Sequence, residues 1–393
     1  MTEITVVGGG IAGLVASIGC AEGGASVRLL EAHERLGGRG RGTEPPFVAN
    51  FGPHVLYANG TLWRFLRERE LLPPVARPPL GGIFFRAGGK RRRTPPLALS
   101  RAVLTLWRVR EAPDDVPFRA WVARRCGDEA AELLSRACGV FAFHHDPGEL
   151  AAGFVWARFR QAFLELPPRA RYVRGGWSAL IAALERGARE RGVAIETGAR
   201  VREPSELAAG GPAIVATELR DAATLLGDDA LAWPSGRTVA LDLGLSGTRR
   251  TPFVVWDLDE AGWIETYSKP DPSLAPKGHA LVQAQMPLRP GESTDDGERR
   301  LEALLDAGFA GGDWRERVVF RRRQLLDGRS GALDPVGASW RDRPAIDRGD
   351  GVYLCGDSVA APGLLSDPAV TSALEAARLA VAQAALRPEI SRL

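Results

Sequence analysis

The sequence lacks any apolar run of about eighteen residues, the length that a membrane-spanning helix needs, although 45% of its 393 residues are hydrophobic. It also lacks room for a signal peptide, because a Gly-rich segment of regular structure begins at Ile4, close to Met1. We therefore expect a cytoplasmic protein that is long enough for two domains.

Cysteine and histidine are scarce, and neither residue type points to a metal. No CxxC pair or metal-binding spacing occurs among the four cysteines, which are Cys20, Cys126, Cys138 and Cys355. We expect them to be small buried residues of a reducing compartment. His144 and His145 lack the companions of a metal site, so none is predicted. The net charge of +3 provides no broad basic field, so no nucleic-acid partner is predicted.

What the sequence does contain is a nucleotide-binding pattern at its start. The pattern comprises an apolar strand over residues 4–7, a Gly-rich turn, a helix over 11–20 and a second strand over 27–30 that ends at Glu31. This order, with an acid closing the second strand, is the context in which Gly-x-Gly-x-x-Gly binds a dinucleotide. An ordinary strand-to-helix turn does not account for Glu31. The sequence therefore predicts a dinucleotide site.

Each glycine of the turn has its own predicted task. Gly8 permits the tight turn, Gly10 lets the backbone approach a pyrophosphate, and Gly13 lets helix and strand pack closely. The helix N-terminus at Ile11 faces the anion with about half a positive charge. Glu31 is expected to accept hydrogen bonds from ribose hydroxyls.

The segment from residue 31 to 39 resembles the one that follows this turn in flavoproteins of the amine oxidase and phytoene desaturase superfamily. Gly37 and Gly38 allow close backbone approach, and Arg39 supplies a cationic fork for phosphate. In that superfamily the Gly-Gly-Arg turn lies against pyrophosphate and flavin. Nicotinamide dehydrogenases usually lack this extension, so the resemblance implies FAD and not NAD.

The C-terminal part resembles the same superfamily. An apolar strand over residues 351–355 ends in Gly356-Asp357, and an Ala-rich helix runs from 368 to 387. The resemblance implies that Asp357 binds the ribityl or pyrophosphate region. It also implies that the helix N-terminus is aimed at the flavin pyrimidine ring, where its dipole would stabilise reduced flavin.

An internal segment gives a third match. A Gly-Gly turn within residues 174–180 precedes a helix over 182–191 and a strand over 199–201. In the superfamily a valine of this strand contacts adenine through its backbone, and the resemblance assigns that contact to Val201.

Residues 50–56 resemble the segment that passes beside the flavin ring system. Gly52 and Pro53 would give it a rigid backbone, and His54 is the one titratable side chain that the resemblance places near the ring. Two roles stay open for His54: proton transfer, or a hydrogen bond to flavin or backbone. Cys355 stands before the Gly-Asp pair, in a strand, so the FAD is expected to be non-covalent.

The cofactor-binding residues predicted in this way come from all three matched parts of the chain. They are Gly8, Gly10, Ile11, Ala12, Gly13, Glu31, Ala32, Gly37, Gly38, Arg39, Gly52, Pro53, His54, Val201, Gly356, Asp357, Ala369 and Val370.

The substrate is expected to be largely apolar. Leu364 stands where amine oxidases carry an aromatic-cage tyrosine, and the strand that would carry their lysine beneath flavin N5 has Arg237-Thr238-Val239 instead. Aromatic residues also gather within residues 57–171, a part of the chain that is expected to be mainly helical. We place Trp156 in the substrate pocket with Leu364, although aromatic residues at helical spacing usually belong to an ordinary core.

Residues 90–110 combine a basic cluster with an amphipathic stretch. The cluster lies at 90–93, and Leu99, Val103, Leu106 and Trp107 follow it at helical spacing. Basic and apolar residues in this arrangement favour peripheral contact with a membrane. A solvated hairpin beside a substrate lid is an equally compatible interpretation.

The predicted fold is α/β, with a Rossmann-like FAD-binding domain built from discontinuous segments and an inserted α+β substrate domain. Residues 1–56, 172–230 and 338–393 would form the first domain. Residues 57–171, mainly helical with a hairpin at 83–93, and residues 231–337, a mixed sheet with a helix at 296–307, would form the second.

The function predicted from this resemblance is hydride transfer from a C–H bond of an apolar small molecule to flavin N5, as in a desaturase or dehydrogenase. A flavin-dependent amine oxidase is one alternative, and a non-redox isomerase or cyclase that uses reduced FAD is another. A flavin-free, prenyl-binding escort-like protein is the third, and the intact Glu31 and Asp357 argue against it. The electron acceptor and the substrate itself stay undetermined.

Overall fold

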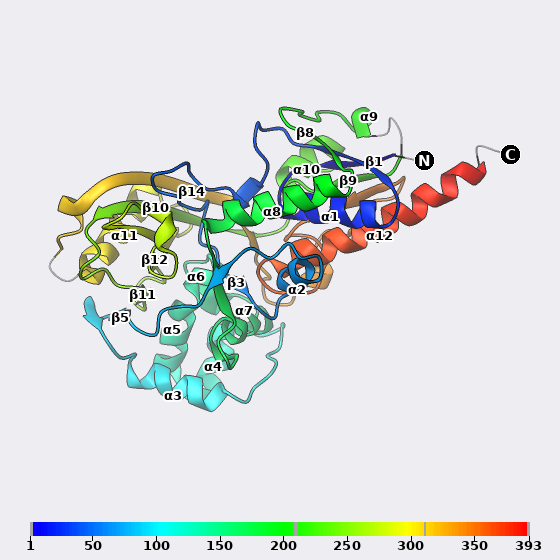
Figure 1. Cartoon of the computed structure of the whole chain (residues 1–393). Helices are drawn as coiled ribbons and strands as arrows, with labels where there is room; N and C mark the ends of the chain where they lie inside the picture. Colours follow the sequence, from blue (N-terminus) through cyan, green and yellow to red (C-terminus); the bar gives the residue numbers. More distant parts are fainter. Residues whose placement is uncertain (1–2, 208–210, 310–311, 391–393) are drawn as a thin grey trace.

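The computed structural model describes residues 3–207, 211–309 and 312–390. A parallel sheet of five strands, in the order β15-β9-β1-β2-β8, forms one part of the molecule (Figure 1). Its strands are β1 (Glu3–Val7), β2 (Ser26–Leu30), β8 (Ala194–Glu196), β9 (Ala213–Val215) and β15 (Val352–Leu354). Strands from the start, middle and end of the sequence therefore share one sheet, with β1 at its centre.

Apolar residues point to both faces of this sheet, as expected for buried parallel strands. In β9, Ile214 packs toward the core that contains α1 (Ile11–Glu22), α8 (Gly176–Glu190) and α12 (Asp367–Ile390). Its neighbour Val215 packs on the opposite side with α10 (Leu219–Leu226). Helices on both faces give the layered arrangement of a doubly wound fold.

Small residues bring α1 and α12 together. A Cβ added at Gly19 of α1 would lie 3.1 Å from the Cβ of Ala377 in α12. Ala373, Ala376 and Ala380 of α12 are fully buried in the same core. The Ala-rich composition of the C-terminal helix thus serves close helix packing against the Gly-rich N-terminal unit.

A second, mixed sheet has seven strands in the order β14-β10-β13-β12-β11-β5-β6. They are β5 (Ile83–Ala87), β6 (Lys90–Arg92), β10 (Ser235–Ser246), β11 (Val254–Asp257), β12 (Trp263–Thr266), β13 (His279–Pro287) and β14 (Val318–Ala332). Helix α11 (Thr294–Gly308) packs on it through Leu301, Leu304 and Leu305. The predicted hairpin at 83–93 is β5–β6, and it joins this sheet because β5 pairs in parallel with β11.

A helical region adjoins this sheet, at the bottom of Figure 1. It comprises α3 (Leu97–Leu106), α4 (Phe118–Cys126), α5 (Asp128–Ala137), α6 (Gly139–Ala142) and α7 (Ala152–Phe159). Helix α2 (Thr61–Glu68) lies against α12. A small sheet of β3 (Leu56–Tyr57), β4 (Val75–Ala76) and β7 (Ala170–Val173), which sequence reasoning did not anticipate, lies between the parts.

The predicted α/β fold class is confirmed, with a parallel Rossmann-like sheet and a separate mixed sheet. The exact domain limits stay a prediction. The predicted strand at 199–201 is wrong, since these residues form an irregular segment in which the Ala199 N–H donates to the Glu31 carbonyl at 2.9 Å. The helix that contains Trp156 begins at Ala152, because the Leu150 and Ala151 backbones bond to Phe118 and Asp334.

The described residues contain no helix long and apolar enough to cross a membrane. Across the same residues there is no cluster of three or more His, Cys, Asp or Glu side chains suited to a metal ion. Three of the four cysteines are buried as expected, whereas Cys126 is partly exposed near the end of α4.

Candidate functional site

A cavity of about 1690 Å³ begins at the carboxyl ends of the parallel strands and extends to the mixed sheet. Val7, Leu30, Val215 and Leu354, which end four of those strands, line it. Ligands of open α/β sheets bind at this edge. The volume exceeds the 300–1,000 Å³ or so of an ordinary small-molecule pocket, so the cavity has room for a cofactor and a second ligand.

Some glycines of the Gly-rich turn are required by the fold, and another borders the cavity. Gly8 has φ +105°, and a Cβ there would lie 2.9 Å from the Ala216 carbonyl oxygen. At Gly13 a Cβ would lie 1.8 Å from the Gly8 carbonyl oxygen, whereas at Gly10 it would meet no atom within 4 Å. Gly8 and Gly13 are therefore required by the fold, and Gly10 borders open space in the cavity wall.

Glu31 holds the turn in place. Its carboxylate is buried and accepts hydrogen bonds from the Gly9 N–H at 2.7 Å and the His33 N–H at 2.9 Å. The sequence predicted only a ribose contact for this residue. Glu31 and the adjoining Ala32 line the cavity, so this clamp lies within the predicted binding site.

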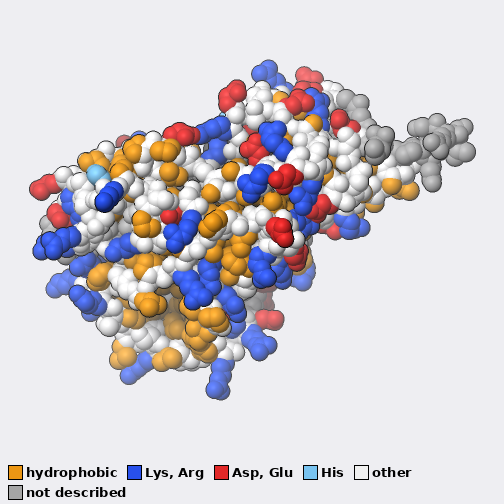
Figure 2. All heavy atoms as spheres, viewed as in Figure 1, with side chains coloured by type: hydrophobic (Ala, Val, Ile, Leu, Met, Phe, Trp, Pro, Cys, Tyr) orange, Lys and Arg blue, Asp and Glu red, His pale blue; other side chains and the backbone are white. Residues whose placement is uncertain are grey.

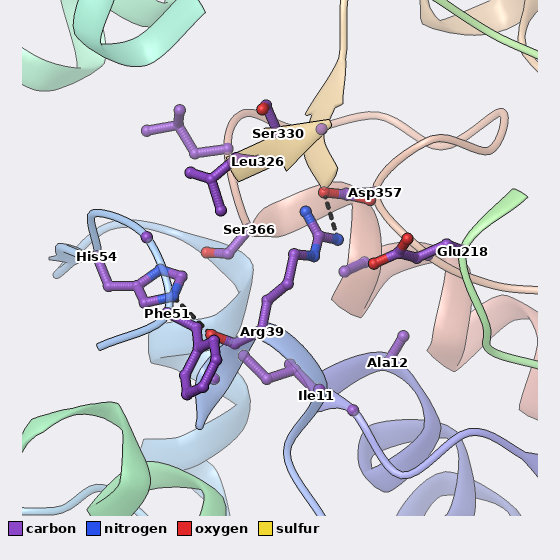
Figure 3. A pocket seen from close by; sticks show the side chains of 18 of the residues that line it. Ile11, Ala12, Arg39, Phe51, His54, Glu218, Leu326, Ser330, Asp357 and Ser366 are labelled. Carbon is purple, nitrogen blue, oxygen red and sulfur yellow. Dashed lines mark hydrogen bonds and ion pairs between the residues drawn. The ribbon is translucent and has the colours of Figure 1, made fainter. Parts of the chain in front are cut away.

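Arg39 and Asp357, which lie far apart in the sequence, form an ion pair of 2.8 Å across the cavity (Figure 3). The Asp357 carboxylate raises the pKa of the Arg39 guanidinium. Figure 3 shows Glu218 beside this pair, with Ser330 and Ser366 nearby. Sequence reasoning found both members of the pair but missed their contact and all three of these neighbours, which carry no motif.

His54 is held by backbone and by an aromatic ring. Its Nε2 lies 2.9 Å from the Arg39 carbonyl oxygen, and its imidazole stacks on Trp177 with centroids 4.2 Å apart. Burial lowers the pKa of His54 to about 4, so the ring is neutral at pH 7. Gly52, at φ +86°, and Pro53 line the cavity beside it. Of the two predicted roles, this geometry matches a hydrogen bond to backbone.

The C-terminal motif is fixed by a serine that the sequence analysis did not single out. The Ser372 hydroxyl in α12 accepts a hydrogen bond from the Gly356 N–H at 3.0 Å and donates one to the Pro368 carbonyl at 2.7 Å. This ties the turn after β15 to the first turn of the helix. Ala369 lines the cavity, whereas Val370 packs into the sheet core.

The other predicted cofactor residues fall into two groups. Most contribute to the cavity wall, namely Gly8, Gly10, Ile11, Ala12, Gly37, Gly38, Val201 and Gly356. Gly13 and Val370 support the wall from behind.

The far end of the cavity is aromatic and holds one buried acid. Tyr57, Tyr172, Trp263 and Tyr267 line it together with Glu265, which is 3% exposed. The Glu265 carboxylate accepts hydrogen bonds from the Tyr172 hydroxyl and from the Trp263 Nε1–H at 3.1 Å. Burial raises the pKa of Glu265. This polar centre on β12 was missed, because one acid in an apolar strand gives no motif.

Neither residue predicted for the substrate pocket lines the cavity. Trp156 is fully buried in the helical core, where it stacks on Phe159 and donates through Nε1 to the Val109 carbonyl at 3.0 Å. Helical spacing here reflects core packing, the alternative that was left open. Leu364 is also outside the lining. Its neighbour Leu365, at φ 57°, lines the cavity instead.

Comparison with known proteins gives the same fold. A sequence profile described as an NAD(P)-binding Rossmann-like domain matches residues 6–69. No curated protein matches the chain.

Solved structures match over nearly the whole chain. The chain is similar to an oxidoreductase from Methanosarcina mazei, with 17% identity, a TM-score of 0.75 and coverage of 95% of this chain and 99% of that one. Wild-type putrescine oxidase bound to putrescine has 15% identity and a TM-score of 0.73, with coverage of 97% of this chain and 99% of that one. Reduced UDP-galactopyranose mutase has 14% identity and a TM-score of 0.67, with coverage of 98% of each chain. The resemblance predicted from the sequence is thus confirmed at the level of the fold.

Proposed function

We propose that this protein is an FAD-dependent oxidoreductase that removes hydride from a C–H bond of a largely apolar small molecule, as a desaturase or dehydrogenase does. The observation that carries the proposal is the single cavity that joins the Gly-rich turn and the Arg39–Asp357 pair to the aromatic end. A dinucleotide at the first end would direct its flavin toward a substrate at the second. The similar fold of putrescine oxidase and of other oxidoreductases supports this interpretation.

The residues present fit FAD. Gly10 leaves space for a pyrophosphate beside the N-terminus of α1, and Arg39 offers a guanidinium to the same group. Asp357 would accept hydrogen bonds from the ribityl chain, and Val201 would contact adenine. Once bound, the flavin would supply the hydride acceptor, while the chain binds, orients and excludes water.

We expect the cofactor to be non-covalent. Cys355 is the cysteine at the cavity wall, and it is only 2% exposed. Burial raises the pKa of its thiol, so the thiolate that a flavin linkage would require is disfavoured.

An amine substrate is the second candidate, and Glu265 favours it. A buried carboxylate among aromatic rings would attract a cationic amine and reject a plain hydrocarbon. Putrescine oxidase, whose wild type has been solved bound to putrescine, shares the fold. Non-redox use of reduced flavin is a third candidate, in keeping with the likeness to UDP-galactopyranose mutase.

The test begins with the purified full-length chain. A yellow protein with close to one FAD per chain is expected, and a colourless protein that takes up no FAD would overturn the proposal. Anaerobic bleaching of the flavin by apolar alkenes and alkanols, compared with primary amines, then separates the first two candidates. If amines bleach wild type and fail with Glu265→Gln, the amine candidate replaces the desaturase one.

We also propose that residues 90–110 contact membranes, through Leu97 and Leu104 together with Trp107, which was named first and is 39% exposed. Leu99 and Leu106 of α3 are buried in the helical core, whereas Leu97 and Leu104 are 64% and 73% exposed. The strand β6 beside them carries Lys90–Arg92. Figure 2 shows the face of the molecule that is seen in Figure 1. Hydrophobic side chains gather on its lower part, with many Lys or Arg and few acids around them.

Sedimentation with anionic vesicles tests the membrane proposal. Leu104→Asp is expected to reduce the bound fraction severalfold, because it places a charge in the contact surface. Leu386→Asp, an equally polar change at a leucine that is 61% exposed on α12, serves as the control. Equal binding by wild type and the Leu104 variant would exclude this surface.

A further inference from the structure

One buried cation in the cavity wall forms no ion pair within the part of the chain that the structure describes. Arg158 of α7 is 6% exposed and lines the cavity, and it makes no ion pair among the residues that the structure describes. Its side chain donates a hydrogen bond from Nη1 to the Phe154 carbonyl at 3.3 Å, within its own helix. Its guanidinium also lies 3.5 Å from the centroid of the Phe154 ring. A guanidinium has five N–H donors, so most of its hydrogen-bonding capacity is unused.

The acids nearest to Arg158 are already paired. Asp334 forms two hydrogen bonds with Arg343, at 2.9 and 2.8 Å, and both side chains are buried. Asp357 is paired with Arg39, and its carbonyl accepts from Arg343 at 3.2 Å. Each of these two acids is thus paired with an arginine other than Arg158. A buried charge without an ion pair is costly unless a ligand pairs with it.

Apolar residues line the same cavity on the segments next to Arg158. Ala162 and Phe163 follow it along the same chain segment and line the cavity, and Phe141 and Phe143 line it from α6 and the residue that follows. Burial lowers the pKa of Arg158 to about 9, so the group is still cationic at neutral pH. The wall thus combines one positive charge with several aromatic rings.

We propose that Arg158 binds an oxyanion carried by the substrate, so that the natural ligand is an amphiphile with a carboxylate or phosphate head and an apolar body. The head pairs with the guanidinium fork, and the body lies against Phe141 and Phe163. The cofactor phosphates have Arg39 and the Gly-rich turn as their own partners, which is why the unpaired cation is assigned to the substrate. This inference rests on the proposed function, since it takes the FAD to occupy the Gly-rich turn, Arg39 and Asp357, which leaves Arg158 to the substrate.

Binding of a matched probe series tests the assignment. Decanoate, decyl phosphate and decanol are titrated into the FAD-loaded full-length protein, and binding is measured by calorimetry and by the change in flavin absorbance. Wild type is expected to bind one or both anionic probes at least about tenfold more tightly than decanol, the gain typical of a charged hydrogen bond. Comparing decanoate with decyl phosphate identifies the head group.

Two variants at Arg158 and one control complete the design. Arg158→Met, which keeps the length of the side chain, is expected to remove the preference, and Arg158→Lys to retain part of it. Arg160→Met changes an arginine two residues further along the chain that does not line the cavity, and it is expected to leave the preference unchanged. If the methionine variant does not fold, the wild-type preference and the lysine variant still decide the matter.

The outcomes separate this inference from the proposed function. Equal affinity of wild type for decanol and both anionic probes would overturn the inference while leaving FAD binding intact. Loss of FAD from Arg158→Met, with the probe preference retained, would also overturn it and assign the cation to the cofactor. A wild-type chain that never binds FAD would refute the proposed function, and decanoate titration of that apoprotein would still report on Arg158.

Discussion

Alanine at Gly10 and at Gly13 should separate binding from folding within one turn. Gly10 has φ −78° and ψ −174°, a conformation open to any residue, and an added Cβ meets no atom within 4 Å. We expect Gly10→Ala to leave the free energy of unfolding of the apoprotein unchanged, or to raise it by about 0.4–1 kcal/mol through the unfolded chain. Its methyl group would nevertheless occupy the path of the pyrophosphate, so FAD should be lost.

Gly13→Ala should act on the fold instead. The helix position gains about 1 kcal/mol in intrinsic propensity from alanine. Against this, the Cβ lies 1.8 Å from the Gly8 carbonyl oxygen, so the backbone of the turn must move. Overpacking of this kind costs about 1–3 kcal/mol and often more where backbone is the obstacle. We therefore expect a net loss of stability of the apoprotein, with FAD lost as a consequence.

Urea unfolding of the two apoproteins and FAD content after dialysis measure both effects. Stability close to wild type with no FAD is the expected result for Gly10→Ala. The reasoning is refuted if Gly10→Ala destabilises the apoprotein by more than about 1 kcal/mol, or if it retains FAD as wild type does. A Gly13→Ala protein of wild-type stability would show that the turn relaxes without cost.

Three other perturbations follow from the same contacts. Glu31→Gln makes either the Gly9 N–H or the His33 N–H face an amide NH₂ group, which cannot accept its hydrogen bond. Urea unfolding should therefore show a free energy of unfolding that is lower by about 1–3 kcal/mol. The pKa of His54 is lowered from 6.5 to about 4, so protons favour the unfolded chain as the pH falls through this window. The free energy of unfolding should fall by about 1–3 kcal/mol between these pH values, and this slope should flatten in His54→Gln. Asp334→Asn breaks the buried ion pair with Arg343 and should lower the free energy of unfolding, measured by heat or urea, by about 3–5 kcal/mol. Replacing Asp334 by leucine and Arg343 by methionine together should recover much of that loss. An equal loss in the single and the double variant would contradict a charge effect.

The nucleotide half of the fold could be predicted because its signals are local. Gly8, Gly10 and Gly13 stand at fixed spacing between a strand and a helix, and Glu31 ends the next strand. Each constraint acts within a few residues, so the sequence displays it directly. The same is true of Gly356-Asp357 and the helix after it.

The substrate half could not be predicted in the same way, since its groups meet only in three dimensions. Glu265 and Tyr172 come from strands of different sheets, and nothing in either segment announces their hydrogen bond. Trp156 illustrates the opposite error, because a large aromatic residue at helical spacing serves a core as well as a pocket. Arg158 is one of many arginines in the sequence, and what distinguishes it is burial without an ion pair to the described residues, which only the structure shows.

The position of β1 at the centre of the parallel sheet has a consequence for how the chain acquires its structure. Its two neighbours are β2, which follows at once, and β9 (Ala213–Val215), which in turn pairs with β15 (Val352–Leu354). During synthesis the far edge of β1 therefore stays without a partner until the first insertion, residues 57–171, has been made, and the far edge of β9 stays without β15 until residues 231–337 have followed. We expect the emerging chain to need protection against strand-edge aggregation, and chains truncated before β9 to aggregate. High sequence separation between neighbouring strands also predicts slow refolding of the complete protein.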